Sequence, residues 1–157
     1  MGVADVPAHD LLALDRQVCF AVVAASRSVV GLYKPILEPL GLTHPQYLVM
    51  LALWQHSPLR VKDLGERLLL DPATLSPLLK RLEQQGLVTR ARDTADERAL
   101  ALRLTDEGAA LRAQAEQVPG RVIERLGLTV GELESIRDAV TTLLEASQRG
   151  SSDAGRG

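Results

Sequence analysis

With 157 residues, the chain has the length of about one domain and can bury a core without disulfide or metal support. Hydrophobic residues make up 46% of it and charged residues 24%, which is typical of a globular chain and excludes a disordered or low-complexity one. The net charge of −2 excludes a strongly basic protein, and the single cysteine, Cys19, excludes a disulfide within the chain.

No targeting or membrane segment is predicted. The first ten residues lack the basic start and apolar core of a secretory signal, and the longest apolar run, near Leu48–Trp54, is much shorter than a bilayer span. We therefore expect a cytoplasmic protein with no membrane partner. Charge is unevenly distributed, because residues 60–103 carry a balance of +2 and the remainder a balance of −4. The middle of the chain is thus the segment best suited to face an anionic partner.

The first predicted helix begins at about Asp10 or Asp15 and ends at Lys34. Pro35 disfavours helical backbone at the residue before it, so we expect the helix to end there. Apolar residues recur along it at spacings of three and four, at Val18, Val22, Ala25, Val29 and Leu32.

A turn over Glu38–Leu42 leads to the second helix. Thr43 with Gln46 predicts a capping box, which opens an apolar helix that runs through Trp54. The residues 56–58 (HSP) close it.

Two helices and a hairpin follow. Val61–Leu69 is the first helix, and Asp71 with Pro72 then predicts a strong start for a second, which Gly86 stops. Beyond the glycine the apolar period changes to two, which predicts strands at Leu87–Arg92 and Leu100–Leu104 joined by the polar tip Asp93–Arg98.

The last third of the chain is predicted to be helical. Thr105 caps a helix to about Val118, which is broken at Pro119 and Gly120. A second capping box at Thr129–Glu132 opens an amphipathic helix through Leu144. The Ser- and Gly-rich tail Ser147–Gly157 is predicted to be disordered.

This order predicts a mainly α fold with a small β-hairpin wing, a winged helix-turn-helix. We expect a single unit over residues 10–146, with helical dimerisation regions at 10–57 and 105–146 and a DNA-binding region at 58–104. Residues 147–157 form the tail.

The second helix of a helix-turn-helix enters the major groove, with its N-terminal residues facing base edges. Hydroxyls near the start of the 72–85 helix can bond bases or phosphates, and its basic residues can neutralise phosphates. Arginines on the hairpin suit a narrow, electronegative minor groove. For any one of these charges a solvated surface is an equally good interpretation. The candidates for binding double-stranded DNA are Thr74, Ser76, Lys80, Arg81, Arg90, Arg92 and Arg98.

The chain resembles the MarR family of winged-helix repressors from about Leu14 to Leu144. The resemblance rests on residues 71–83 (DPATLSPLLKRLE), 86–90 (GLVTR), 96–98 (DER) and 104–108 (LTDEG). It implies a two-fold homodimer joined by the first and last helices, whose paired helices read successive major grooves of an operator. It also implies that Asp96 and Arg98 form the wing-tip pair, with the arginine in the minor groove.

A narrower resemblance is to the organic-hydroperoxide-sensing (OhrR) branch of that family. It rests on residues 17–20 (QVCF), 24–27 (AASR), 32–35 (LYKP), 40–43 (LGLT) and 45–50 (PQYLVM). The resemblance implies that Cys19 is the peroxide-reactive residue and that Tyr33 contacts its sulfur from the partner subunit. The branch has a second such tyrosine at the position of His44, which we also predict to contact the sulfur because a histidine can donate a hydrogen bond. Some members have another tyrosine at the position of Val23. Tyr47 matches a different family tyrosine.

Cys19 has two interpretations from chemistry alone. A lone cysteine on an apolar helix is most often a small buried hydrophobe. Near a helix start, however, the backbone dipole favours a thiolate, and Arg16 and Arg27 could add positive potential. The resemblance favours redox sensing: a hydroperoxide oxidises Cys19 to sulfenic acid, a low-molecular-weight thiol then forms a mixed disulfide, and the repressor leaves DNA.

Two alternatives stay open, namely a MarR-type repressor controlled by a small ligand, with Cys19 inert, and a thiol peroxidase that uses Cys19. No metal ligands are predicted, because His9, His44, His56 and Cys19 lack metal-ligand spacing. There is no Gly-rich phosphate loop, and carboxylates such as Asp63, Glu66 and Glu83 are interpreted as solvated helix faces. We therefore predict no cofactor and no catalytic residue.

Overall fold

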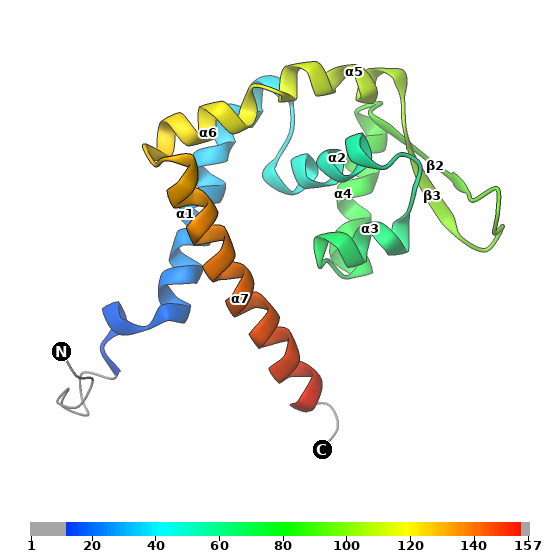
Figure 1. Cartoon of the computed structure of the whole chain (residues 1–157). Helices are drawn as coiled ribbons and strands as arrows, with labels where there is room; N and C mark the ends of the chain where they lie inside the picture. The colour runs from blue at the N-terminus through cyan, green and yellow to red at the C-terminus, as the bar shows by residue number, and fades with distance from the viewer. Residues whose placement is uncertain (1–11, 155–157) are drawn as a thin grey trace. The chain divides into compact units, whose positions relative to one another are not determined.

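A computed structural model describes residues 12–154. The chain divides into two compact units. The central unit is Tyr33–Arg121, and the terminal unit comprises the residues up to Leu32 and from Val122 onwards. The predicted start of the first helix at Asp10 lies outside the described residues. Figure 1 labels the helices and strands, most of which belong to the central unit.

The central unit contains α2 (His44–Gln55), α3 (Val61–Leu68), α4 (Pro72–Gln84) and α5 (Asp106–Ala115). Its core is built largely from leucines. Fully buried side chains come from every layer, at Leu37, Leu53, Leu64, Leu75, Leu79, Leu82 and Leu102. The capping box of α2 is confirmed, because Gln46 N donates to Thr43 Oγ1 at 3.4 Å and Thr43 N donates to Gln46 Oε1 at 2.9 Å.

Within the described residues, one antiparallel sheet has the strand order β1–β3–β2. Strands β2 (Val88–Arg92) and β3 (Leu100–Leu104) form the predicted hairpin, with Arg90 opposite Leu102. The sequence analysis missed β1 (Leu59–Arg60), which pairs with β3 through Leu59 and Leu102. A two-residue strand is too short to show alternation, so only the pairing reveals it.

Helix α1 (Val18–Leu37) differs from the prediction at both ends. Asp15 lies in a short 3-10 helix (Leu14–Arg16) and does not cap α1; the carbonyl of Gln17 accepts the first helical bond, from Ala21 N at 3.1 Å. Pro35 lies inside the helix, where the prediction had it end. The next two residues, Ile36 and Leu37, are buried, and their burial favours one more turn.

The helices after the hairpin also required correction. Helix α5 ends at Ala115, and Pro119 and Gly120 lie in the first turn of another helix, α6 (Val118–Leu126). Proline is tolerated there because a first-turn N–H has no partner within the helix.

Helix α7 (Val130–Ala154) begins at the predicted capping box, where Thr129 N donates to Glu132 Oε2 at 2.8 Å. It continues through Ala154, so residues 147–154 are helical where a disordered tail was predicted; residues 155–157 lie outside the described residues. In this last part Ser151 Oγ donates to the carbonyl of Ser147 at 3.0 Å, the local bond that a serine inside a helix makes to the residue four positions earlier.

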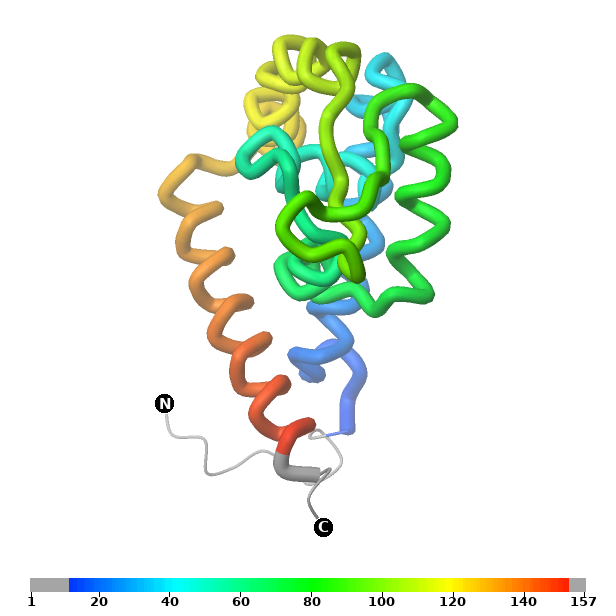
Figure 2. The backbone as a smooth tube through the Cα atoms, turned by 90° about the vertical axis from the view of Figure 1, so that its right-hand side faces the viewer, coloured from blue at the N-terminus to red at the C-terminus, as the bar shows by residue number. Residues whose placement is uncertain are grey.

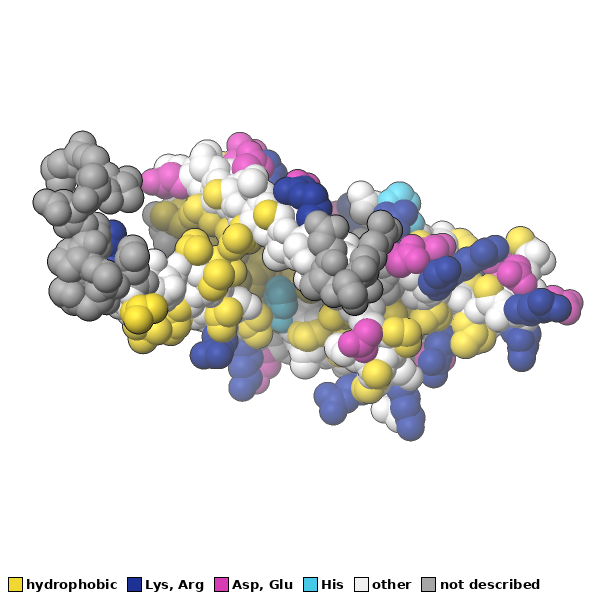
Figure 3. All heavy atoms as spheres, turned by 90° about the horizontal axis from the view of Figure 1, so that it is seen from below, with side chains coloured by type: hydrophobic (Ala, Val, Ile, Leu, Met, Phe, Trp, Pro, Cys, Tyr) yellow, Lys and Arg dark blue, Asp and Glu magenta, His cyan; other side chains and the backbone are white. Residues whose placement is uncertain are grey.

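Both long helices of the terminal unit expose apolar residues at helical spacing. The exposed large hydrophobic residues are Val18, Phe20, Val23 and Val30 on α1 and Val130, Ile136, Val140 and Leu144 on α7. Such side chains, yellow in Figure 3, are visible over the left of the face drawn. Among the described residues, the segment Val18–Leu40 is long and apolar enough to cross a membrane by length and composition, unlike the shorter run considered in the sequence. A helix that is covered by other protein passes the same test, so this finding is weak evidence for a span.

Candidate functional site

Helix α4 has an apolar face and an exposed polar face. Leu75, Leu79 and Leu82 are buried, while Leu78 is only half-buried. The four predicted DNA-facing residues of this helix, Thr74, Ser76, Lys80 and Arg81, are all exposed. Neither Lys80 nor Arg81 takes part in an ion pair among residues 12–154. Their charge is therefore available to an anionic partner.

Asp71 caps this helix, as predicted. Its Oδ1 accepts a 2.7 Å hydrogen bond from Thr74 N. That bond, together with a weaker contribution from the Thr74 side chain, lowers the pKa of Asp71. Thr74 is thus oriented by the cap at the exposed start of the helix.

The hairpin runs alongside α4, and its strand β2 contacts that helix. Figure 2 is turned so that the hairpin faces the viewer. Arg90 forms an ion pair with Glu83 of α4, with Nη2 2.8 Å from Oε2. Arg92 Nη1 donates to the carbonyl oxygen of Glu97 at 2.7 Å. Two of the three predicted hairpin arginines are therefore engaged within the chain.

The third arginine, Arg98, lies at the exposed tip. Its backbone N–H donates to Asp96 Oδ1 at 3.0 Å, so Asp96 shapes the tip on which Arg98 stands. The guanidinium of Arg98 has no ion pair in the described part of the chain. In Figure 3, Lys and Arg side chains, dark blue, project from the end of the molecule that carries the hairpin.

Arg60, which the sequence analysis did not single out, is bonded to the start of the hairpin tip. Its Nε lies 2.5 Å from Asp93 Oδ2. The pKa of Asp93 is lowered, first by the backbone N–H of Ala95 and then by Arg60. The pair joins the residue before α3 to the turn that begins the hairpin tip.

Tyr33 and His44, the predicted sulfur-contacting residues, lie together in the central unit. Their ring centroids are 4.7 Å apart, and the ring planes are inclined by 60°. Burial lowers the pKa of His44 below its ordinary value of 6.5, so its imidazole is neutral at pH 7. Burial raises the pKa of Tyr33, so its phenol keeps its proton and can donate it in a hydrogen bond.

Tyr47 is a third member of this aromatic cluster. Its ring centroid lies 5.9 Å from that of Tyr33, and its side chain is buried. The pKa of Tyr47 is raised by burial and by Tyr33. The sequence signal for it was an aromatic residue within the apolar helix α2, which does not distinguish a core residue from a site residue.

Cys19 is the second residue of α1 and belongs to the terminal unit. The prediction that it lies in the first turn of a helix is confirmed. Its thiol is exposed in the isolated chain, so the interpretation as a buried hydrophobe does not hold for a single subunit. Among the described residues, no group of three or more His, Cys, Asp or Glu side chains could hold a metal ion.

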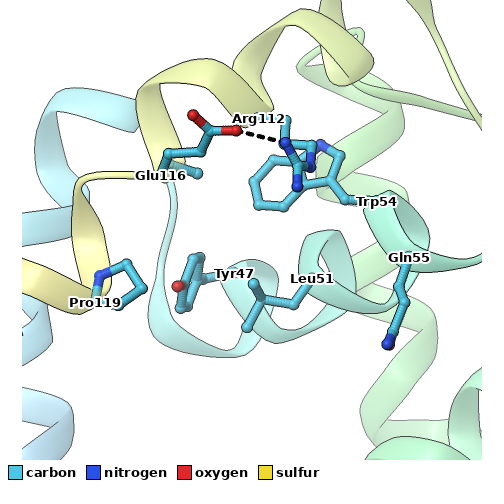
Figure 4. Close-up of a pocket in the computed structure, with 8 residues that line it drawn as sticks. Tyr47, Leu51, Trp54, Gln55, Arg112, Glu116 and Pro119 are labelled. Carbon is cyan, nitrogen blue, oxygen red and sulfur yellow. Dashed lines mark hydrogen bonds and ion pairs between the residues drawn. The ribbon is translucent and has the colours of Figure 1, made fainter.

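A pocket of about 270 Å³ opens between α2 and the segment that joins α5 to α6 (Figure 4). Tyr47, Leu51 and Trp54 form its apolar wall, and the ion pair of Arg112 and Glu116 lies beside it. Trp54 is held in place because its Nε1 donates to the carbonyl oxygen of Gly108 at 2.8 Å. The pocket can accept a small apolar molecule.

Comparison with known proteins agrees with this geometry. A MarR family model matches residues 42–100. The organic hydroperoxide resistance transcriptional regulator of Bacillus subtilis (strain 168) is 45% identical over 136 residues, which cover 87% of this chain and 92% of that protein.

Solved structures are also similar. Reduced AbfR bound to DNA is 34% identical, with a TM-score of 0.71, over 88% of this chain and 96% of AbfR. The PcaV transcriptional regulator from Streptomyces coelicolor, solved with its natural ligand, is 26% identical, with a TM-score of 0.76, over 87% and 97% of the two chains.

Three findings assign the family. The fold is helical with a small antiparallel sheet, an exposed helix with basic residues lies beside a hairpin, and a relative is 45% identical over most of both chains. The chain belongs to the MarR family of DNA-binding transcriptional regulators, and it is not an enzyme.

Proposed function

We propose that the protein is a redox-sensing repressor, which binds operator DNA as a reduced homodimer and leaves it when an organic hydroperoxide oxidises Cys19. The observation that carries this proposal is the exposed thiol in the first turn of α1. Support comes from the similarity to a regulator named for organic hydroperoxide resistance and to a DNA complex named for its reduced state.

The chemistry needs one thiolate and one thiol partner. The Cys19 thiolate attacks a peroxide oxygen, the O–O bond breaks, and the alkoxide takes up a proton and leaves as an alcohol. The cysteine is thereby oxidised to sulfenic acid and the hydroperoxide is reduced. Because Cys19 is the only cysteine, a second thiol must come from a small molecule, which displaces water and forms a mixed disulfide.

The exposed apolar positions of the terminal unit support the proposed homodimer. Ile136, Val140 and Leu144 lie four residues apart on α7 and share one face. Apolar surface of this kind is typical of an interface with another chain. In the dimer, Tyr33 and His44 of one subunit would contact the Cys19 sulfur of the other. A group added to that sulfur would push the two aromatic side chains away from Cys19.

DNA recognition is assigned to α4 and the hairpin. Thr74 and Ser76 would face bases or phosphates in the major groove, and Lys80 and Arg81 would neutralise phosphates. Arg98 would enter the minor groove from the tip that Asp96 shapes. Arg90 and Arg92 would contribute positive potential, while Arg90 joins the hairpin to Glu83 of α4 and Arg92 is bonded to the Glu97 carbonyl within the tip.

Gel-shift titration tests the redox proposal. The probe is a duplex selected from a random-sequence pool by the reduced protein, and the protein is treated with cumene hydroperoxide, with or without free cysteine. We expect treatment to weaken binding by the wild type and to leave Cys19→Ser bound. Mass spectrometry should find the mixed disulfide on Cys19. Equal release of both proteins would contradict the proposal.

The pocket beside Trp54 favours a second candidate, a repressor released by a small apolar ligand with Cys19 inert. Its apolar wall of Tyr47, Leu51 and Trp54 suits such a molecule, and the related PcaV was solved with a ligand. This candidate predicts that Cys19→Ser responds to its inducer as the wild type does. The same gel shift therefore separates the two mechanisms.

A further inference from the structure

Two glutamine side chains join the start of α2 to the end of α4. Gln46 is almost fully buried, with 4% of its surface exposed, and is the buried polar residue of the described core. Its Nε2 donates to Gln85 Oε1 at 3.2 Å. Gln85 follows the last residue of α4, and its Nε2 donates to the carbonyl oxygen of Gly41 at 2.7 Å.

These bonds close a ring in which every amide group is used. Thr43 N donates to Gln46 Oε1 at 2.9 Å, and Gln46 in turn donates to Gln85. Gln85 then donates back to Gly41, which lies beside Thr43 in the chain. Both side chains act as donor and acceptor, so neither glutamate nor an apolar side chain could replace them without losing a bond.

The ring of hydrogen bonds adjoins Tyr33 and His44, the aromatic side chains proposed above to contact the Cys19 sulfur. Thr43 caps α2, and His44, the first residue of α2, lies with its ring 4.7 Å from that of Tyr33. A movement of His44 therefore shifts the cap residue with which Gln46 is bonded. At the other end, Gln85 N donates to the carbonyl of Arg81, so a movement of Gln85 is transmitted to the last turn of α4.

We propose that Gln46 and Gln85 are positioning residues that couple the Tyr33–His44 cluster to the DNA-reading helix α4. This inference rests on the redox function proposed above and specifies how the signal crosses the central unit. The burial of Gln46 and the pairing of both side chains support such a role, because a fully paired polar network favours one arrangement; Gln85 itself is exposed. Coupling requires an element whose arrangement both sites influence, and the ring joins Thr43, which precedes His44, to Gln85, which follows α4.

The test compares the full-length wild type with Gln85→Met, which keeps the side-chain length and removes both amide bonds. Gln84→Ala is the matched control, since Gln84 is the exposed neighbour in α4. Operator affinity is measured before and after cumene hydroperoxide with free cysteine, once mass spectrometry shows complete modification of Cys19. The quantity compared is the ratio of the two dissociation constants.

We expect this ratio to fall in Gln85→Met by at least about fivefold relative to the wild type, the lower end of usual allosteric coupling. Gln84→Ala should keep the wild-type ratio. A merely structural role would weaken binding equally in both states and leave the ratio unchanged, which would overturn the inference. If the wild type itself is not released, the redox proposal fails as well, and the two failures are thus distinguishable.

Two further measurements keep the test decisive if Gln85→Met binds DNA poorly. The variants Gln46→Met, Gln85→Met and their double should lose the same amount of coupling, because they interrupt one link. Amide hydrogen exchange, which needs no DNA, should show faster exchange in the last turn of α4 after modification of the wild type only. Unchanged exchange in the modified wild type would contradict the coupling.

Discussion

Replacing Gly108 by alanine is expected to destabilise the central unit and to displace the start of the hairpin. Gly108 is buried in the first turn of α5. A Cβ at this position would lie 2.0 Å from the carbonyl oxygen of Leu87 and 3.3 Å from Leu104 Cδ2. The first distance is far inside van der Waals contact, so the backbone of Leu87 must move.

The size of the effect follows from three contributions. Inserting a methyl group into a packed region costs about 1–3 kcal/mol. The Leu87 carbonyl also accepts from Thr105 N at 3.1 Å, and loss of that bond costs about 1 kcal/mol. Alanine in place of glycine returns about 0.5–1 kcal/mol within a helix. The expected net loss of unfolding free energy is about 2 kcal/mol.

Urea unfolding measures this loss, followed by the fluorescence of Trp54 and by circular dichroism at one fixed protein concentration. Trp54 is the only tryptophan, and it hydrogen-bonds to Gly108. Gly120→Ala and Gly131→Ala are matched controls, because a Cβ at either helical position meets nothing within 4 Å. Both should be neutral or slightly stabilising. A Gly108→Ala protein as stable as the wild type would refute the steric argument.

Three other predictions concern the hairpin, a helix cap and pH. Arg98→Ala should weaken operator binding in a gel shift and make it less dependent on salt. The control Arg112→Ala, which removes a charge from α5, should do neither. Equal effects of the two substitutions would contradict the role of the hairpin in DNA binding. Thr105→Ala should cost about 1–2 kcal/mol in urea unfolding, since Thr105 Oγ1 accepts from Gly108 N and donates to the Gly86 carbonyl, while Thr105→Ser should restore most of it. Burial lowers the pKa of His44, so the unfolding free energy should hold above about pH 6.5 and decline as the pH falls through the lowered value. His44→Tyr should flatten that decline, and an unchanged pH profile would show that His44 is not its source.

Local signals predicted the starts of helices well. Thr43, Asp71, Thr105 and Thr129 each bond a backbone N–H within three residues, so the sequence alone holds the information. The end of α1 could not be predicted in this way. Proline disfavours helical backbone at the preceding residue. At Pro35 this effect was outweighed by the burial of the residues that follow, and that burial depends on the tertiary fold.

The candidate site was predicted in part. Exposure of the polar face of α4 follows from the period of its leucines, and it is confirmed. The partner of Arg90 could not be foreseen, because it depends on how β2 lies against α4, and that of Arg92 depends on the conformation of the hairpin tip. The proximity of Tyr33 and His44 came from family resemblance and not from spacing. Gln46 and Gln85 were missed because their contact joins residues far apart in the chain.

The bridge between Arg60 and Asp93 has a consequence for how the hairpin meets DNA. Because the ion pair holds the start of the hairpin tip, the tip loses less conformational entropy when it docks, and less of the binding free energy is spent on ordering it. The ion pair is itself exposed to solvent ions. Rising ionic strength therefore weakens the ion pair that orders the hairpin tip and also screens the DNA phosphates. Both effects lower the affinity for DNA.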